Sequence, residues 1–157
     1  MEVKLILVGK TTSAYLLEGE QNYGNRLKHY LRFKEHVIPE LKNVRGLSVD
    51  QIRAKEGQLI LNQLDRSDVV VLLDENGDQL TSVQFSEWIQ KKMNSGIKGI
   101  TFVIGGAYGF SKEVYDRANV RVGLSKMTFS HQMVRLIFKE QLYRACTILK
   151  GEPYHHK

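Results

Sequence analysis

The sequence has 157 residues, 42% of them hydrophobic, which is the length and apolar content of one compact domain over residues 1–157. Its one cysteine excludes an intrachain disulfide and a cysteine-rich metal site, and no apolar stretch approaches the roughly eighteen residues of a membrane span, so we expect a cytoplasmic protein without a membrane segment or a bound metal. The net charge is +6, and residues 121–157 supply most of it with seven basic and two acidic residues, a balance that suits contact with an RNA backbone but also an ordinary solvated helix.

The first half of the chain alternates short apolar runs with amphipathic stretches, which predicts an α/β fold with a largely parallel sheet flanked by helices. Residues 2–9 are expected to form the first strand and residues 13–33 a long helix. A weaker strand over 36–41 is expected at a sheet edge, because Pro39 cannot donate a ladder hydrogen bond. Residues 49–64 carry apolar side chains at helical spacing.

The second half continues this alternation with stronger signals. Residues 67–74 form a continuous aliphatic run, as expected for a strand covered on both faces, and residues 75–79 are expected to form a turn. Thr81 and Gln84 have the spacing of a capping box at the start of the next helix. The remaining expected elements are a strand over 99–106, a helix opened by Ser111, a short strand over 119–125 and a last helix over 131–149.

The segment VGKTTS, residues 8–13, is similar to the end of a phosphate-binding P-loop. That motif needs another glycine five positions before the glycine of its Gly-Lys pair, so that backbone amides can wrap a phosphate. Lys4 occupies that position here, inside the expected first strand. We therefore do not expect nucleotide hydrolysis.

Three strand ends are candidates for a ligand site. The turn GGAYG at 105–109 follows a buried strand, and glycines allow a backbone to approach a ligand closely, although such a turn is as often a plain connection. The ends of the runs VLLDENG and VGLSKMTFSH could meet it at one edge of a parallel sheet, where α/β folds bind ligands. That edge would offer backbone amides and carbonyls to an adenine and apolar walls for its stacking.

The last expected helix has a polar face whose role its spacing leaves open. His131, Arg135 and Lys139 are four residues apart and share this face, which could grip phosphate or be a wet surface, and spacing alone favours the wet surface. Cys146 lies in the opposite apolar stripe, so we expect a buried thiol rather than a nucleophile. His155 and His156 have no spaced partners, and we do not expect them to bind a metal.

Four segments together resemble a known family: VVLLDENGDQLTSVQFSEWI, FVIGGAYGF, LSKMTFSHQMVRLIFKEQLYRA and GEPYHH. In this order they are similar to the RlmH family of SPOUT methyltransferases, and the similarity covers the whole length. The resemblance implies a SPOUT-type fold with a C-terminal trefoil knot, a homodimer, and S-adenosyl-L-methionine as the cofactor. It also implies methylation of N3 of a pseudouridine in the intersubunit-bridge stem-loop of bacterial 23S rRNA within the assembled ribosome.

The resemblance also implies site residues. His131, Arg135, Tyr154 and His155 would bind the nucleotide and place its ring, with His131 or His155 assisting deprotonation and the C-terminal tail completing a partner subunit's site. The family usually ends Tyr-His-Arg, whereas this chain has His156 followed by Lys157, which puts the tail's role in doubt. The cofactor would contact the three strand ends at Leu73, Gly105, Gly106, Leu124, Ser125, Lys126, Met127, Thr128 and Phe129.

Two other functions remain open at this point. One is a SPOUT methyltransferase that acts on another RNA, such as tRNA. The other is a non-catalytic protein that binds RNA or the ribosome, although such a protein would have no need of a cofactor pocket.

Overall fold

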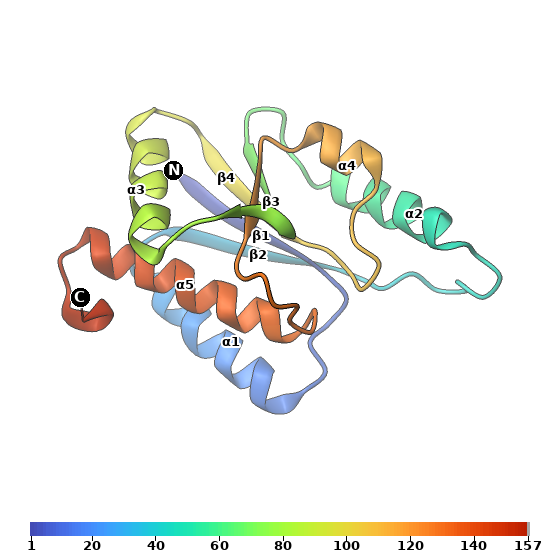
Figure 1. Cartoon of the computed structure of the whole chain (residues 1–157), viewed down its shortest axis with the longest axis horizontal. Coiled ribbons are helices and arrows are strands. Elements are labelled where there is room, and N and C mark those ends of the chain that lie inside the picture. The colour runs from blue at the N-terminus through green and yellow to red at the C-terminus, as the bar shows by residue number, and fades with distance from the viewer. Residues whose placement is uncertain (157) are drawn as a thin grey trace.

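The computed structural model describes residues 1–156, which form a five-stranded parallel sheet between two layers of helices (Figure 1). Its strands, in the sheet order β2-β1-β4-β3-β5, confirm the predicted α/β fold with a parallel sheet flanked by helices. The strands are β1 (Glu2–Val8), β2 (Arg32–Ile38), β3 (Val69–Gln79), β4 (Gly99–Ile104) and β5 (Val120–Gly123). The helices are α1 (Ala14–Leu27), α2 (Val49–Leu61), α3 (Ser82–Asn94), α4 (Lys112–Arg117) and α5 (Met133–Leu149), followed by the 3₁₀ turn η1 (Pro153–His155).

The two faces of the sheet build two hydrophobic cores, because successive side chains of a strand point to opposite faces. Leu5 of β1 and Phe102 of β4 pack with residues of α1, α3 and α5. Ile6 and Val103 face the other way and pack with residues of α2 and α4. β4 is buried at every residue, as expected for a central strand that helices cover on both faces.

Helices begin where the predicted capping residues stand. The Thr81 hydroxyl accepts a hydrogen bond from the Gln84 N–H, and the Gln84 side chain accepts one from the Thr81 N–H, so the predicted capping box is confirmed. The Ser111 hydroxyl accepts the N–H of Val114 at the start of α4. These bonds satisfy backbone donors that have no partner inside the helix.

Several predicted boundaries are wrong. The edge strand expected over 36–41 is β2, which begins at Arg32 and ends at Ile38, before Pro39. The helix expected over 13–33 ends at Leu27, and Phe33 lies in β2, because residues 32–38 pair with β1 along its full length and bury Phe33. Residues 75–79 are not a separate turn, since β3 continues to Gln79 past a shift in its pairing with β5. The helix expected over 49–64 ends earlier, at Leu61.

The extension of β3 lies directly against the backbone of β5. A Cβ atom on Gly77 would stand 2.7 Å from the carbonyl carbon of Arg121 and from the nitrogen of Val122. A Cβ atom on Gly123 would stand 3.0 Å from the carbonyl oxygen of Gly77. Only glycine permits so close an approach, so β3 and β5, which pair in parallel, lie in tight backbone contact.

Candidate functional site

A cavity of about 610 Å³ lies where β3, β4 and β5 end, at the carboxyl edge of the sheet. Residues 73–76 of β3, the loops that follow β4 and β5, and the start of α5 form its walls, so the three segments converge at the edge where a parallel sheet is expected to bind ligands. Lys126, predicted to contact the cofactor, is exposed and is not among the lining residues. The other eight predicted cofactor-binding residues line the cavity: Leu73, Gly105, Gly106, Leu124, Ser125, Met127, Thr128 and Phe129.

The walls of this cavity suit a ligand that has both a flat apolar part and polar edges. Its volume falls within the range of about 300–1,000 Å³ that is usual for small-molecule sites. The glycine turn 105–109 brings backbone amides and carbonyls to the wall. The apolar side chains among the lining residues include Ile104, Phe129 and Val134. An adenosine-bearing cofactor fits this chemistry, because its base can stack on the apolar walls while backbone groups bind its edge.

Hydrogen bonds hold the loop between β5 and α5 in place. The Thr128 hydroxyl donates to Glu75 Oε2 at 2.6 Å, which ties this loop to the extension of β3. The Ser125 hydroxyl accepts the N–H of Met127 at 2.9 Å. The loop wall is therefore shaped by the protein's own contacts, which lowers the cost of ordering it around a ligand.

Asp74 and Tyr115 form a second fixed part of the wall that the sequence analysis missed. The Tyr115 hydroxyl donates to Asp74 Oδ2 at 2.7 Å, and the Asn76 N–H donates to Asp74 Oδ1 at 3.1 Å. Burial and the bond to Asp74 raise the pKa of Tyr115 to about 12, so its hydroxyl stays protonated and able to donate at neutral pH. The Arg121 guanidinium lies 4.3 Å from the centre of the Tyr115 ring. Residue spacing gave no signal for this contact, because α4 and β3 are separated in sequence.

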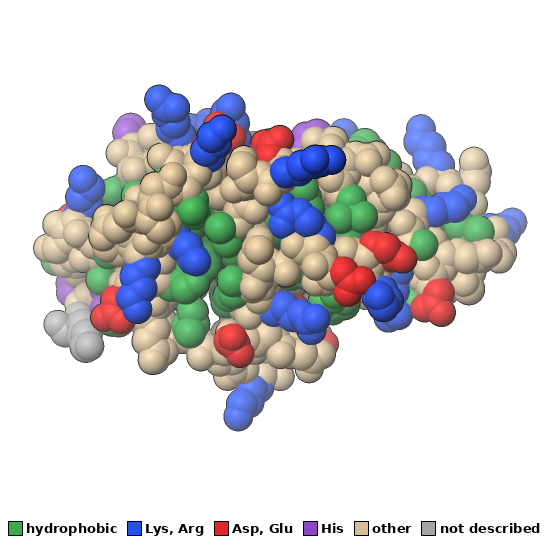
Figure 2. Space-filling view, turned by 90° about the horizontal axis from the view of Figure 1, so that it is seen from above, with side chains coloured by type: hydrophobic (Ala, Val, Ile, Leu, Met, Phe, Trp, Pro, Cys, Tyr) green, Lys and Arg blue, Asp and Glu red, His purple; other side chains and the backbone are tan. Residues whose placement is uncertain are grey.

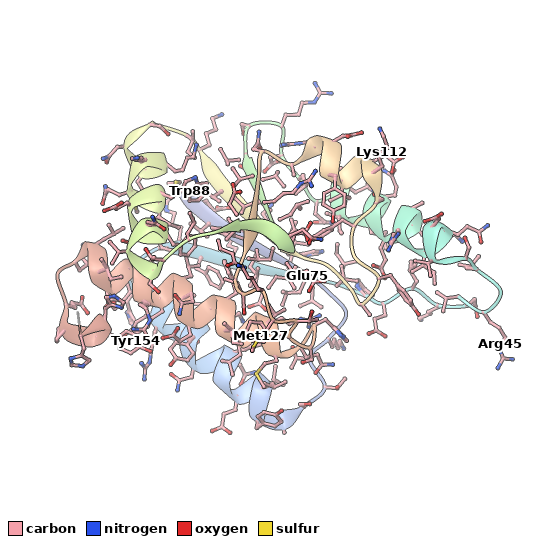
Figure 3. All side chains as sticks on the ribbon, in the orientation of Figure 1. Arg45, Glu75, Trp88, Lys112, Met127 and Tyr154 are labelled. Atoms are coloured by element: carbon pink, nitrogen blue, oxygen red, sulfur yellow. The ribbon has the colours of Figure 1, made fainter. Side chains whose placement is uncertain are left out.

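The predicted nucleotide-binding residues do not meet within one chain. His131 lines the cavity at the start of α5. Tyr154 and His155 belong to η1, which packs beside α5, and His155 contacts Arg144 on that helix. The 13 residues from His131 to Arg144 span about 20 Å at the helical rise. Figure 3 shows the same separation, with Met127 toward the start of α5 and Tyr154 toward its other end.

Arg135 lies apart from both His131 and the C-terminal turn. It is only 1% exposed, and its guanidinium donates to the carbonyl oxygens of Val8 at 2.6 Å and Gly9 at 2.8 Å. It also donates to the Thr11 hydroxyl at 3.1 Å. Arg135 therefore holds the end of β1, and it lines a second cavity of about 650 Å³ between α1, β2 and α5 rather than the first.

The polar face of α5 is not a wet surface, which corrects the interpretation that its spacing favoured. Lys139 is 3% exposed, and its ammonium lies 2.7 Å from Glu35 Oε2 and 3.6 Å from Glu20 Oε1. These carboxylates come from β2 and α1, so a cation on α5 can be buried among them. Two of the basic residues counted in the C-terminal segment, Arg135 and Lys139, thus add little to the surface charge.

The surface is nevertheless basic over a wide area. Figure 2 shows Lys and Arg side chains scattered across the full width of one face of the molecule, with Asp and Glu side chains among them. A distributed basic surface suits a large polyanion better than it suits a small anionic ligand.

The C-terminal turn is held by a cluster of polar side chains. The Tyr154 hydroxyl lies 3.0 Å from Glu140 Oε1 and 3.1 Å from the Tyr23 hydroxyl. Arg144 donates to Glu140 at 2.6 Å and lies 3.1 Å from Nδ1 of His155. Burial and the bonds to Tyr23 and Glu140 raise the pKa of Tyr154, so its hydroxyl stays protonated at neutral pH. The turn is thus presented as a fixed unit, and Arg144 is a member that the sequence analysis missed.

The end of the tail adds little to this cluster. His156 is exposed and adopts a left-handed backbone conformation with φ of 51°. Lys157 lies outside the described residues.

Within residues 1–156 no group of three or more His, Cys, Asp and Glu side chains is placed to hold a metal ion. No helix of this part of the chain is long and apolar enough to cross a membrane.

In the segment similar to a P-loop, residues 8–13, backbone N–H groups bind a protein side chain. The side-chain oxygen of Gln132 accepts the N–H of Thr12 at 3.0 Å and the N–H of Ser13 at 3.4 Å. These donors stand at the start of α1, where a P-loop would hold an anion. A protein side chain therefore already satisfies both of these donors.

Cys146 is 5% exposed and lies in the core under α5, as predicted. Burial raises the pKa of its thiol to about 12, so the thiol stays protonated at neutral pH. A protonated buried thiol is not a nucleophile.

Comparison with known proteins gives a consistent result. A family model described as "Predicted SPOUT methyltransferase" matches residues 1–155. Proteins named "Ribosomal RNA large subunit methyltransferase H" are 57% identical in Christiangramia forsetii, 54% in Parabacteroides distasonis and 55% in Flavobacterium johnsoniae. Each alignment covers 157 residues and the whole of both chains.

Proposed function

Because the chain belongs to the SPOUT methyltransferases, in the family of ribosomal RNA large subunit methyltransferase H, we propose that it methylates ribosomal RNA with S-adenosyl-L-methionine as the donor. The finer proposal is transfer to N3 of a pseudouridine in the intersubunit-bridge stem-loop of 23S rRNA. This is the specificity that the resemblance in sequence implies.

The observation that carries the proposal is the convergence of three strand ends on one cavity. Eight residues that the family resemblance implies line it, and they come from β3 and from the loops that follow β4 and β5. The motifs of a binding protein without a cofactor would have no reason to converge on a cavity of this size. When bound, S-adenosyl-L-methionine supplies a methyl group already activated by its sulfonium and leaves as S-adenosylhomocysteine.

The chain's own residues then have two tasks. They must hold the acceptor nitrogen in line with the methyl group, at about 3–3.5 Å, and they must accept the proton that this nitrogen loses. His131 lines the cavity, and an imidazole can accept such a proton, so we assign this role to His131 first. The basic surface holds the RNA backbone while the target base enters the cavity.

A second copy of the chain completes the site in this proposal. His131 and the fixed cluster of Tyr154, His155 and Arg144 are separated by most of the length of α5, so one chain cannot apply both to one nucleotide. In a homodimer the tail of the partner subunit would reach the cavity. Mixing a chain with a disabled cavity and a chain with His155→Ala tests this: heterodimers with one intact site should restore about a quarter of the full activity. No restoration in mixed dimers would contradict it.

We also propose that the C-terminal half is threaded as a trefoil knot. The support is the backbone contact between the β3 extension and β5, which glycines at 77 and 123 permit. Pulling the two termini apart with optical tweezers should leave an extended chain shorter than its contour, because a tightened knot retains residues. A fully extended chain would contradict the knot.

Transfer of radiolabelled methyl groups to ribosomes from a strain that lacks the gene tests the function, with the product nucleoside identified by mass spectrometry. We expect label in N3-methylpseudouridine and weaker labelling of protein-free rRNA, because a domain this small has little surface for reading RNA. Label in another nucleoside or in tRNA would identify a different substrate. No label despite cofactor binding to the protein would contradict the ribosomal proposal, and absence of cofactor binding would favour a non-catalytic role. The cytoplasmic location predicted from the sequence agrees with a ribosomal substrate.

A further inference from the structure

Helix α2 buries a carboxylate in the middle of its apolar face. Ile52, Glu56 and Ile60 recur at intervals of four residues, and all three are buried. Glu56 is 9% exposed, and its Oε1 atom has no hydrogen-bond partner among residues 1–156. Burial and the nearby Glu40 raise the pKa of Glu56. An unpaired carboxylate at this position costs more stability than an apolar residue or a neutral glutamine would.

Glu56 lies directly against the glycine turn of the cofactor cavity. A Cβ atom on Gly106 would stand 3.0 Å from Glu56 Oε1 and 3.2 Å from Oε2. Gly106 itself lines the cavity. Glu56 itself is not among the lining residues, and its carboxylate lies next to the cavity wall only because Gly106 has no side chain.

A cation stands one helical turn earlier on α2. Arg53 lines the cavity, and its Nε atom donates to the carbonyl oxygen of Tyr108 at 2.6 Å, within the same glycine turn. Its Nη1 atom lies 3.5 Å from the exposed carboxylate of Asp50. Side chains three residues apart share one side of a helix, so Arg53 and Glu56 face the glycine turn together. The guanidinium has five donors and keeps donors free for an anion.

We infer that Arg53 and Glu56 form a subsite for the α-amino acid end of the methyl donor. This inference rests on the proposed function. Arg53 binds the carboxylate of the ligand, and Glu56 accepts hydrogen bonds from its ammonium group. A zwitterionic group matches this pair because it brings an anion to the guanidinium and a cation to the unpaired carboxylate, which then loses the cost of its burial.

Three ligands and two variants test the subsite by calorimetry. S-adenosylhomocysteine carries both charged groups, decarboxylated S-adenosylhomocysteine lacks the carboxylate, and 5′-methylthioadenosine lacks both. Glu56→Gln should weaken binding of the first two ligands about tenfold or more and leave 5′-methylthioadenosine unchanged. Arg53→Gln should weaken only S-adenosylhomocysteine. Glu113→Gln, which removes an exposed carboxylate on α4, serves as the control and should change none of them.

The outcomes separate this subsite from a structural role and from the proposed function. If Glu56→Gln weakens all three ligands equally, or none of them, the subsite is wrong. If the unmodified protein binds none of the three adenosyl ligands, the proposed function fails as well. Thermal unfolding of each variant shows whether it is folded, and Glu56→Leu, which keeps the site apolar, gives a second variant with the same expected pattern.

Discussion

Two cavities of similar volume lie on this molecule, and their charged residues differ in one respect. In the cavity between α1, β2 and α5, Lys139 is paired with Glu20 and Glu35, and Arg135 holds the carbonyls at the end of β1. At the cavity beside β3, β4 and β5, Glu56 is buried without a partner for its Oε1 atom. Volume does not separate a ligand site from a packing defect here. Each cavity has one buried atom without a hydrogen-bond partner among residues 1–156, Arg135 Nε in the first and Glu56 Oε1 beside the second, but the Arg135 guanidinium makes three other hydrogen bonds. The difference is therefore the unpaired carboxylate, which is costly to bury unless a ligand satisfies it.

The largest effect is expected at the paired cavity. Lys139→Ala would leave the carboxylates of Glu20 and Glu35 without their cation, and removing one partner of a buried ion pair costs about 3–5 kcal/mol. Urea denaturation should therefore show a large loss of stability. Lys150→Ala, at an exposed lysine, should change it little. A stability loss under about 1 kcal/mol for Lys139→Ala would show that this ionic cluster is not structural.

At the other cavity the largest effect should be on rate rather than on stability. His131→Ala should slow single-turnover methyl transfer about a hundredfold, because it removes the proton acceptor that we assign. His36→Ala, an exposed histidine on β2, is the control. If the variants His131→Ala and His155→Ala and their double variant all keep the full rate, neither histidine assists deprotonation.

Thermal unfolding with and without the cofactor should show which of the two cavities binds it. A ligand selective for the folded state stabilises it by about 2.7 kcal/mol at a hundred times its Kd. For a chain of this length, that corresponds to a Tm rise of about 5–10 °C. Glu20→Gln, in the paired cavity, should lower the starting Tm without changing the rise. A smaller rise in this variant would mean that the cofactor depends on the paired cavity.

The smallest expected effect is a pH-dependent gain in thermal stability when the unpaired carboxylate of Glu56 is removed. Glu56 has a pKa raised from 4.5 in the folded protein, so the unfolded chain ionises first and the folded state loses stability as the pH rises past 4.5. Glu56→Gln should therefore match the parent protein at low pH. Near neutral pH it should have a Tm higher by about 2–4 °C without cofactor. Equal Tm values at both pH values would show that the Glu56 charge is not destabilising.

The sequence predicted the layer architecture from local patterns, and the family resemblance pointed to most of the residues that line the cavity beside β3, β4 and β5. Aliphatic runs marked β3 and β4, and motifs marked the three strand ends that converge. Two other predictions failed because contacts between segments far apart in the sequence determine the structure there. Phe33 left the helical pattern because its segment pairs with β1, and Arg135 and Lys139 are buried because carbonyls of the β1 end and carboxylates of α1 and β2 meet them.

One residue of the proposed subsite on α2 stands out in the sequence. Glu56 stands between Ile52 and Ile60 on an apolar face, where a charged residue is out of pattern. Its contact with Gly106 could not be predicted, because α2 and the glycine turn are about fifty residues apart and only the fold brings them together.

A crystal structure with S-adenosylhomocysteine would show which cavity binds the cofactor. We expect the ligand in the cavity beside β3, β4 and β5, with its carboxylate on Arg53 and its ammonium on Glu56. Ligand bound instead between α1, β2 and α5 would contradict the assignment of the cavity, and ligand bound in the expected cavity with its amino acid end turned away from α2 would contradict the subsite.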